Sequence, residues 1–383
     1  MANIVDYVKN NCTSTFEEHA LSIEDALVLA ELSYLKFDAL LNRMSEKPVS
    51  IKELASMKDS EFMFSDPKYG KDYRELFDAA LSSMRFSDIS FSFYINRIDV
   101  EKETQFAAVT YLLPTGEAFV AFRGTDESIV GWQEDFGLAL NKPITGQRLS
   151  VDYLEKVCSV LKCDLSLGGH SKGGNLAVYS AMNSPDDIKS RLIHVYSFDG
   201  PGFRPEVLKE SGSADVIGKI ISVIPQSSLV GMLLNTSDDS IVVNSRSVGV
   251  FQHNPYYWVI KDGSLSRTEI TEQHRRWINT FNEWIFSLDE EHLERFVSLF
   301  CEVLNATEAS DTRELTGQIF KSAGNVFKKT RDIDDDTKDF LQKIGRSYFD
   351  LVKDMVKSEV REKMDEALNA VRSVKKAEST GRE

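Results

Sequence analysis

A glycine-rich turn around Ser171 places the strongest constraint on how this chain can fold. The run Gly169-His170-Ser171-Lys172-Gly173 has the pattern G-x-S-x-G, in which a serine occupies a sharp turn between a strand and a helix. The apolar stretch at 165–167 precedes the turn, and a helical pattern over 172–183 follows it. Glycines on both sides of the serine let the strand and the helix approach closely. This context favours a nucleophilic serine, and the alternative is a glycine-rich turn with an incidental serine.

The segments around this turn alternate between strand and helix patterns. Apolar stretches at 106–113 and 117–122 flank Pro114-Thr115-Gly116 and predict a hairpin. A strand with one wet face is predicted at 89–95, where apolar and polar residues alternate. Downstream, the spacing predicts a helix over 151–161 and strands at 192–198 and 219–224. A hairpin followed by β-α-β units is the order of an α/β-hydrolase sheet, mostly parallel and with helices on both faces.

Helical patterns precede and follow this alternating region. Ser22 is a candidate N-cap for a helix over 22–35, because Asp25 stands three residues later and could complete a capping box. From about residue 268 the apolar spacing is helical to the end of the chain. We therefore expect one α/β-hydrolase-like domain over residues 1–305 and a helical C-terminal extension over 306–383. Docking of that extension on a partner or a membrane surface is a weaker alternative to a solvated helical tail.

The balance of charges limits the classes of partner. The 383 residues include 45 Lys and Arg against 60 Asp and Glu, a formal net charge of −15. A chain this acidic is a poor candidate for a nucleic-acid partner. The four cysteines lack zinc-ligand spacing and are too few for a disulfide framework. Because neither a secretory signal nor a run of 18 apolar residues is found, we expect a soluble, cytoplasmic protein without a transmembrane segment. Its oligomeric state stays open.

A second motif, Phe122-Arg123-Gly124-Thr125, closes the apolar strand upstream of the serine. In a serine hydrolase of this kind, such a loop supplies one hydrogen-bond donor to the oxyanion that forms during the reaction. The residue after the nucleophile, here Lys172, supplies the other donor through its backbone N–H. Thr125 offers a backbone N–H and a hydroxyl. Lys172 and Thr125 are therefore the candidate oxyanion hole, and the alternative for Thr125 is an ordinary strand-end turn.

Several motifs taken together resemble a known family. The Phe122–Thr125 motif, the run Gly131-Trp132-Gln133-Glu134-Asp135-Phe136 and the run from Gly169 to Asn175 resemble the class 3 lipases. A closer resemblance is to the Mbeg-like group of bacterial α/β-hydrolase-like proteins, whose function is unknown. It covers roughly residues 1–305. It is also carried by the runs Ser197-Phe198-Asp199-Gly200-Pro201-Gly202-Phe203, Ile224-Pro225-Gln226-Ser227-Ser228-Leu229-Val230-Gly231 and Gln252-His253-Asn254-Pro255.

The resemblance implies a catalytic histidine, and His253 is our candidate. It lies in a loop after the last expected sheet strand, where the family's histidine falls, and it satisfies the chain order of serine, acid and histidine. His170 adjoins the serine and should point away from its hydroxyl. The alternative for His253 is a histidine of a surface loop. The other histidines precede the sheet, lie within a strand, or lie on expected helices: His19, His194, His274 and His292.

The acid is the point at which the chain departs from the lipase pattern. Class 3 lipases carry an aspartate after the strand that corresponds to 219–224, whereas this chain reads Gln226-Ser227-Ser228 there. Asp199 ends the preceding strand, and a hydrolase sheet can place an acid at that position. We therefore favour Asp199. Asp239 or Asp238 on a later loop remains an alternative, and so does a dyad in which a hydroxyl such as that of Ser228, or a backbone carbonyl, orients the histidine.

These residues together predict a serine hydrolase that cleaves acyl or lipid esters. Ser171 would attack the carbonyl, His253 would transfer the proton, and Asp199 would orient His253. No metal or organic cofactor is expected, and the partner would be a small-molecule or lipid ester. The resemblance to lipases also suggests a lid over 126–137 anchored by Trp132, unless Trp132 packs in the core. The competing hypothesis is a catalytically inactive binding module on a hydrolase fold.

Overall fold

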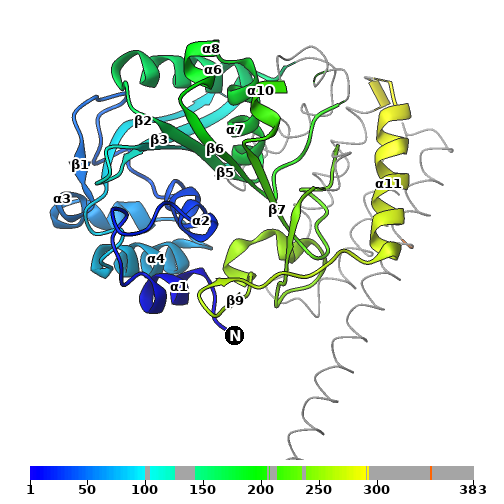
Figure 1. The fold of residues 1–383 in the computed structure, drawn as a ribbon, viewed down its shortest axis with the longest axis horizontal. Coiled ribbons are helices and arrows are strands. Elements are labelled where there is room, and N and C mark those ends of the chain that lie inside the picture. The colour runs from blue at the N-terminus through cyan, green and yellow to red at the C-terminus, as the bar shows by residue number, and fades with distance from the viewer. Residues whose placement is uncertain are drawn as a thin grey trace, which may run out of the picture.

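The central sheet has eight strands whose spatial order follows their order in the sequence, β1 to β8 (Figure 1). Strands β1 to β4 pair antiparallel, and β4 to β8 pair parallel, so the sheet is mixed. The strands are β1 Val49–Ser50, β2 Ser90–Asp99, β3 Thr104–Leu112, β4 Ala118–Phe122, β5 Leu165–His170, β6 Leu192–Phe198, β7 Ile220–Pro225 and β8 Ile241–Val243. A separate two-stranded ribbon is formed by β9 Ile260–Lys261 and β10 Ser264–Leu265.

The computed structural model describes residues 1–99, 104–125, 143–204, 207, 214–234, 239–289, 291–292 and 346. Within this part the helices are α1 Ile4–Asn11, α2 Ile23–Leu32, α3 Ile51–Ser56, α4 Gly70–Ser82, α6 Thr145–Val160, α7 Lys172–Asn183, α8 Asp186–Lys189, α10 Ala214–Ile217 and α11 Glu272–Ser287, with 3₁₀ helices η1 Ser60–Phe64, η2 Gly249–His253 and η3 Pro255–Tyr257. The proposed lid, Asp238 and nearly all of the expected C-terminal extension lie outside the described residues. No helix in the described part is long and apolar enough to cross a membrane.

The two faces of the sheet are covered by different parts of the chain. Because the strand order never reverses, right-handed crossovers carry the connecting helices to one face, where α6, α7 and α10 lie (Figure 1). The N-terminal helices α1, α2 and α4 cover the opposite face. Two separate hydrophobic clusters result, one on each face. The predicted α/β sheet with helices on both faces is confirmed, and the N-terminal segment supplies one of its two layers.

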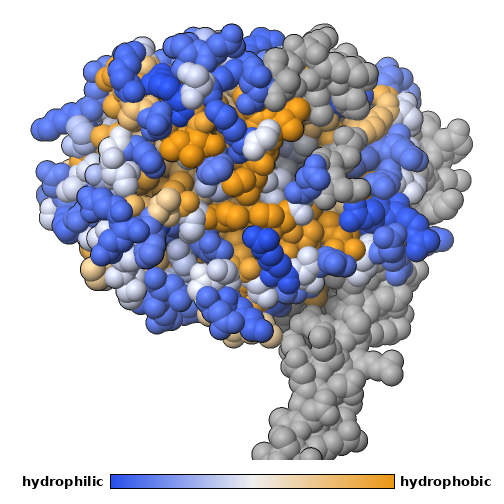
Figure 2. All heavy atoms as spheres, viewed as in Figure 1, coloured by the Kyte–Doolittle hydropathy of each residue, from blue (hydrophilic) through white to orange (hydrophobic). Residues whose placement is uncertain are grey.

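Apolar side chains also gather over the middle of the sheet in the view of Figure 2, between the N-terminal helices and β7. The half-buried residues Ile221 of β7 and Ile241 of β8 pack against the same hydrophobic cluster as the N-terminal helices. The hydrophobic cluster under the N-terminal layer therefore extends to β7 and β8.

The start of α2 is held by a buried carboxylate. Ser22 caps the helix, and Asp25 completes the predicted capping box, with its Oδ2 2.8 Å from the Ser22 backbone nitrogen. Arg85 donates to both carboxylate oxygens, at 2.8 and 2.6 Å, and the Tyr7 hydroxyl donates to Oδ1 at 2.9 Å. Charge-assisted bonds of this kind are stronger than neutral ones, particularly when two form in parallel. They fix the start of α2 to α1, through Tyr7, and to the chain after α4, through Arg85, and α2 carries Glu31, which reaches the site described below.

The expectation that strand 89–95 has one wet face is wrong. Phe91 and Tyr94 belong to the cluster under the N-terminal helices, whereas Phe93 and Ile95 belong to the cluster on the opposite face. A register shift between Ser92 and Ile95 interrupts the pairing with β3, and Phe93 has a positive φ of 54°. The extra residue of such a bulge reverses which face the following side chains point to. Residues 91–95 are therefore buried on both faces of β2, and the alternation in the sequence does not mark an exposed side.

The other predicted strands lie close to their predicted positions, whereas the helix predicted over 151–161 begins earlier, at Thr145, and ends at Val160. The hairpin closes at Pro114-Thr115-Gly116, where Gly116 has a φ of 87°, and the helix after Ser171 spans Lys172–Asn183 as expected. Strand β8 was not predicted, because three residues are too short to show a pattern. The ribbon of β9 and β10 was missed for the same reason.

Candidate active site

The carboxyl ends of four neighbouring strands meet at one edge of the sheet. The register pairs Phe122 of β4 with Gly169 of β5, His170 with Phe198 of β6, and Phe198 with Val223 of β7. The residues that follow these strands are therefore adjacent in space. They are the loop after Phe122, Ser171, Asp199 and the turn after Pro225, which are the segments that the sequence singled out. Ligands of open α/β sheets bind beside the carboxyl ends of the strands, where these residues cluster.

Ser171 occupies a strained turn between β5 and α7. Its φ of 59° and ψ of −132° lie in a region that residues other than glycine rarely adopt. Its backbone nitrogen donates to Phe198 O at 2.9 Å, which ties the turn to β6. A Cβ at Gly169 would lie 2.4 Å from Phe122 O, and one at Gly173 would lie 2.0 Å from the same oxygen. Only glycine fits at these two places, because β4, β5 and α7 converge there.

Asp199 and His253 are joined by a hydrogen bond. His253 Nδ1 lies 2.6 Å from Asp199 Oδ2, although 54 residues separate the two in the chain. The Asp199 side chain is buried, whereas the His253 side chain is 21% exposed. A carboxylate oxygen can only accept, so Nδ1 carries the proton and Nε2 presents a lone pair. Within the described residues no other carboxylate bonds to His253, and Asp239, which that part includes, makes no hydrogen bond to it.

The turn after β7 encloses the other oxygen of Asp199. Ser228 Oγ donates to Asp199 Oδ1 at 2.5 Å, and the backbone N–H of Gly231 donates to the same oxygen at 3.1 Å. A Cβ at Gly231 would lie 2.3 Å from Asp199 Oδ1, so the close approach of this amide requires glycine. The sequence analysis considered Ser228 as a direct partner of the histidine. In the structure Ser228 bonds to the aspartate, and the aspartate bonds to the histidine.

The segment that carries His253 is held by Gln252, whose side chain is completely buried. Its Oε1 accepts from the backbone N–H of Ser227 at 2.9 Å, and its Nε2 donates to Ser247 O at 2.8 Å. The indole of Trp258 donates to the Gln252 carbonyl at 2.7 Å. These bonds tie η2 to the turn after β7. The motif Gln252-His253-Asn254-Pro255 thus combines an anchor residue with the exposed histidine.

No direct hydrogen bond joins Ser171 to the imidazole of His253 in the part of the chain that the structure describes. The contacts do bring His253 to the residue before the serine, because the rings of His170 and His253 lie 4.5 Å apart, centroid to centroid. Hydrogen bonds between a nucleophile and its base are often long in ligand-free enzymes and shorten when substrate binds. The arrangement therefore places an oriented histidine against the residue that precedes the strained serine.

The two expected oxyanion donors lie on either side of the serine. A Cβ at Gly124 would lie 3.1 Å from Ser171 Cβ, which places the loop that ends in Thr125 next to the serine. Lys172 opens α7, so its backbone N–H is among the first-turn amides that have no acceptor within the helix. The Lys172 side chain is buried and points away, since its Nζ donates to Gln105 O at 3.0 Å. Only the backbone of Lys172 is thus placed to act at the site.

Two residues near the site were missed by the sequence analysis, Glu31 at the end of α2 and Tyr34 just after it. The Tyr34 hydroxyl lies 3.1 Å from His170 Nδ1, and Glu31 Oε1 lies 3.5 Å from the same nitrogen. The stretch Leu27-Val28-Leu29-Ala30-Glu31-Leu32 is apolar apart from Glu31, and all of it is buried. The sequence signal that could have identified Glu31 is a single carboxyl within an apolar run, which indicates a buried polar side chain.

The remaining histidines stand apart from the serine. His19 is exposed, and His194 is half-buried with its ring against Tyr196. His274 of α11 is buried and its Nε2 lies 2.7 Å from Ser228 O, so it supports the turn that encloses Asp199. Burial lowers the pKa of His274, which keeps it neutral. His292 contacts Asp289 at the end of the described segment.

Burial raises the pKa of the Glu31 carboxyl from its ordinary value of 4.5 to about 8, with a further contribution from the nearby charge of Asp72. Between these two pH values the unfolded chain releases this proton and the folded protein keeps it. The free energy of unfolding should therefore fall as the pH rises from 4.5 to 8, by up to about 1.4 kcal/mol per pH unit. We expect Glu31→Gln to remove this fall, so that the variant gains most over the wild type at pH 8 and above.

Urea unfolding measured from pH 5 to pH 9 checks this prediction. Glu17→Gln is the matched control, because it replaces an exposed glutamate by the same side chain and should leave the profile close to that of the wild type. An equal dependence on pH in Glu31→Gln and the wild type would contradict the assigned protonation of Glu31.

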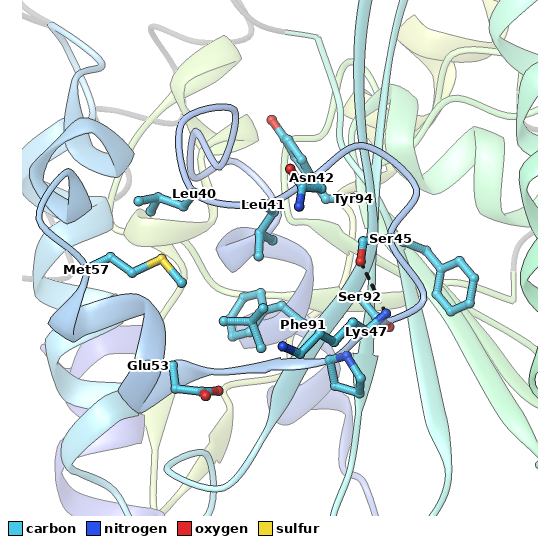
Figure 3. Close-up of a pocket in the computed structure, with 13 residues that line it drawn as sticks. Leu40, Leu41, Asn42, Ser45, Lys47, Glu53, Met57, Phe91, Ser92 and Tyr94 are labelled. Carbon is cyan, nitrogen blue, oxygen red and sulfur yellow. Dashed lines mark hydrogen bonds between the residues drawn. The ribbon is translucent and has the colours of Figure 1, made fainter.

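A cavity of about 260 Å³ lies elsewhere in the molecule (Figure 3). It lies between three segments, which are helix α3, strand β2 and the chain after α2. Its lining includes Leu41, Met57 and Phe91, with Lys47 and Glu53 along one side. Ser171, Asp199 and His253 do not take part in its lining. No group of three or more His, Cys, Asp or Glu side chains among the described residues could hold a metal ion.

Comparisons with known proteins identify similar structures and a matching family. A search of solved structures finds the crystal structure of M37 lipase, 14% identical, with a TM-score of 0.38 over 69% of this chain and 80% of that chain. It also finds the Rhizomucor miehei lipase propeptide complex, 12% identical, with a TM-score of 0.33 over 58% of this chain and 67% of that one. A comparison with curated protein sequences gives no significant match. The profile of the Mbeg1-like family matches residues 80–302, more than half of the chain, and includes Ser171, Asp199 and His253. The chain therefore belongs to the Mbeg1-like family.

Proposed function

We propose that this protein is a serine hydrolase that cleaves carboxylic esters, acyl or lipid esters among them. The observation that carries the proposal is the hydrogen bond of 2.6 Å between Asp199 and His253, at the sheet edge where Ser171 occupies its strained turn. A serine is a weak nucleophile until a base removes its proton. An aspartate that holds Nδ1–H leaves Nε2 of the histidine free to do so.

The proposed reaction uses each residue for one task. Ser171 Oγ attacks the ester carbonyl while His253 Nε2 takes the hydroxyl proton, and His253 then returns this proton to the leaving alcohol. Asp199 holds the imidazole and stabilises its positive charge. The backbone N–H groups of Lys172 and the loop at Thr125 stabilise the negative oxygen of the tetrahedral intermediate. Water then hydrolyses the acyl-enzyme with the same base.

The experiment is reaction with a fluorophosphonate probe, followed by peptide mass spectrometry. Labelling should map to Ser171, and Ser171→Ala should remove it. Release of p-nitrophenol from short-chain and long-chain p-nitrophenyl esters then measures turnover and the preferred acyl length. Labelling at another residue, or folded wild-type protein that neither reacts with the probe nor hydrolyses any ester, would contradict the proposal.

A second candidate is a catalytically inactive binding module on the same fold. The observation in its favour is that Ser171 makes no direct hydrogen bond to His253 within the described part of the chain. Such a module would bind an ester or its acid without turnover. The same probe experiment separates the two candidates, because binding without labelling of Ser171 favours the module.

A further inference from the structure

His170 makes a specific contact with the backbone of the proposed catalytic histidine. Its Nε2 lies 2.8 Å from the carbonyl oxygen of His253. A carbonyl can only accept a hydrogen bond, so Nε2 of His170 carries a proton. The two rings also lie against each other, with centroids 4.5 Å apart and planes inclined by 36°. His253 is therefore held twice, by Asp199 at the ring and by His170 at the main chain.

The other ring nitrogen of His170 faces two polar groups from the N-terminal layer. The Tyr34 hydroxyl is 3.1 Å from Nδ1, and Glu31 Oε1 is 3.5 Å from it. Tyr34 is itself stacked on Tyr73 of α4, with ring centroids 6.1 Å apart. In the neutral tautomer with a proton on Nε2, Nδ1 has a lone pair that accepts from the Tyr34 hydroxyl. The contacts of both nitrogens thus select one tautomer.

The surroundings of His170 keep it uncharged. Burial, reinforced by the charge of the neighbouring His253, lowers the pKa of His170 well below its ordinary value. The groups that face it are Glu31 and Tyr34 from α2 and its following turn, with Tyr73 and Asp72 of α4 and Tyr256 of η3 behind them. Burial keeps Glu31 protonated at neutral pH. A neutral His170 does not repel the positive charge that His253 acquires during proton transfer.

We propose that His170 is a positioning residue of the active site, which fixes the main chain of His253 through its Nε2–H while Tyr34 holds its tautomer. This inference rests on the proposed serine-hydrolase function. Its physical basis is that a displacement of about 1 Å at a catalytic group can lower the rate roughly a hundredfold. Because His170 is one residue before Ser171, the same contact couples the position of the nucleophile to that of the base.

Two substitutions at position 170 separate positioning from packing. His170→Phe keeps an aromatic ring of similar size but has no hydrogen-bond donor, whereas His170→Gln loses the ring but can place an amide N–H near the position of Nε2. We expect His170→Phe to lower kcat about ten- to hundredfold with little change in KM, and His170→Gln to retain clearly more activity. Tyr34→Phe should lower kcat about two- to tenfold, because it removes the hydroxyl that contacts His170 Nδ1. An activity of His170→Phe equal to or above that of His170→Gln would overturn the proposal.

A spectroscopic measurement on the wild type keeps the test independent of variant folding and of activity. Long-range ¹H–¹⁵N correlation spectra of the histidine rings report which nitrogen carries the proton. We expect His170, assigned with the His170→Gln spectrum or by selective labelling, to be the Nε2–H tautomer from pH 6 to pH 7.5. The Nδ1–H tautomer, or a ring that exchanges between tautomers, would overturn the proposal. If the wild type neither reacts with the fluorophosphonate nor hydrolyses esters, the proposed function fails, whereas an active wild type with an unaffected His170→Phe variant refutes the positioning role alone.

Discussion

Asp199→Asn should lower kcat for ester hydrolysis about 10³- to 10⁴-fold, a smaller loss than that of Ser171→Ala. The geometry of the aspartate dictates how the asparagine must turn. Ser228 Oγ and the Gly231 N–H both donate to Oδ1, so the amide oxygen has to stay on that side. The amide NH₂ then faces His253 Nδ1, in the place of the oxygen that lies 2.6 Å away in the wild type.

An NH₂ group at this place reverses the tautomer of His253. Nδ1 becomes an acceptor and the proton moves to Nε2, which can no longer take the proton of Ser171. Initial rates with p-nitrophenyl butyrate and the rate of fluorophosphonate labelling measure the loss. Asp239→Asn is the matched control, because it makes the same change outside the hydrogen bond and ion pair that His253 makes with Asp199, and it should keep activity within about twofold of the wild type. A larger loss in Asp239→Asn than in Asp199→Asn would reassign the acid.

Gly173→Ala should destabilise the fold by about 3 kcal/mol or more, or prevent soluble expression. The added Cβ would lie 2.0 Å from Phe122 O and 2.8 Å from Phe122 C. Both are backbone atoms at the end of β4, an interior strand, so they cannot rotate away as a side chain could. Relief of this overlap requires β4 and α7 to separate at the point where Ser171 and the Arg123-Gly124 loop meet.

Urea unfolding measured by circular dichroism gives the change in the free energy of unfolding. Gly218→Ala is the control: Gly218 is exposed, and its added Cβ would meet no atom within 4 Å. We expect the control to change the free energy of unfolding by less than about 0.5 kcal/mol. A similar stability for the two variants would show that the close approach of β4 and α7 is not required.

Local sequence signals were sufficient for most of the sheet and for the serine turn. The run Gly169-His170-Ser171-Lys172-Gly173 predicts its own geometry, because the strained backbone and the close strand–helix contact depend on residues next to one another in the chain. The capping box of Ser22 and Asp25 is likewise local, and the structure confirms it. The bulge in β2 was not predictable in this way, since the alternation at 89–95 is the same whether or not the register shifts.

The sequence favoured Asp199 as the acid of the site but left alternatives open. Asp199, Asp238 and Asp239 were all candidates, because chain order and the end of a strand do not measure the distance to a histidine. The choice of Asp199 follows from its hydrogen bond to His253, across 54 residues, and from the donors of Ser228 and Gly231. The run of Ser228 and Gly231 after β7 encloses an aspartate that follows the neighbouring strand, β6.

The sequence by itself thus determined the turn at Ser171, the order of strands and helices, and the small set of residues from which a site could be built. Each of these depends on neighbours in the chain, through backbone conformation and hydrophobic spacing. Only the tertiary structure decided which carboxylate bonds to His253. It also decided that Tyr34 and Glu31 lie beside His170, although they are 136 and 139 residues away in the chain. The physical reason is that hydrogen bonds and burial depend on distances between segments, and these distances are set when the sheet and its N-terminal layer pack together.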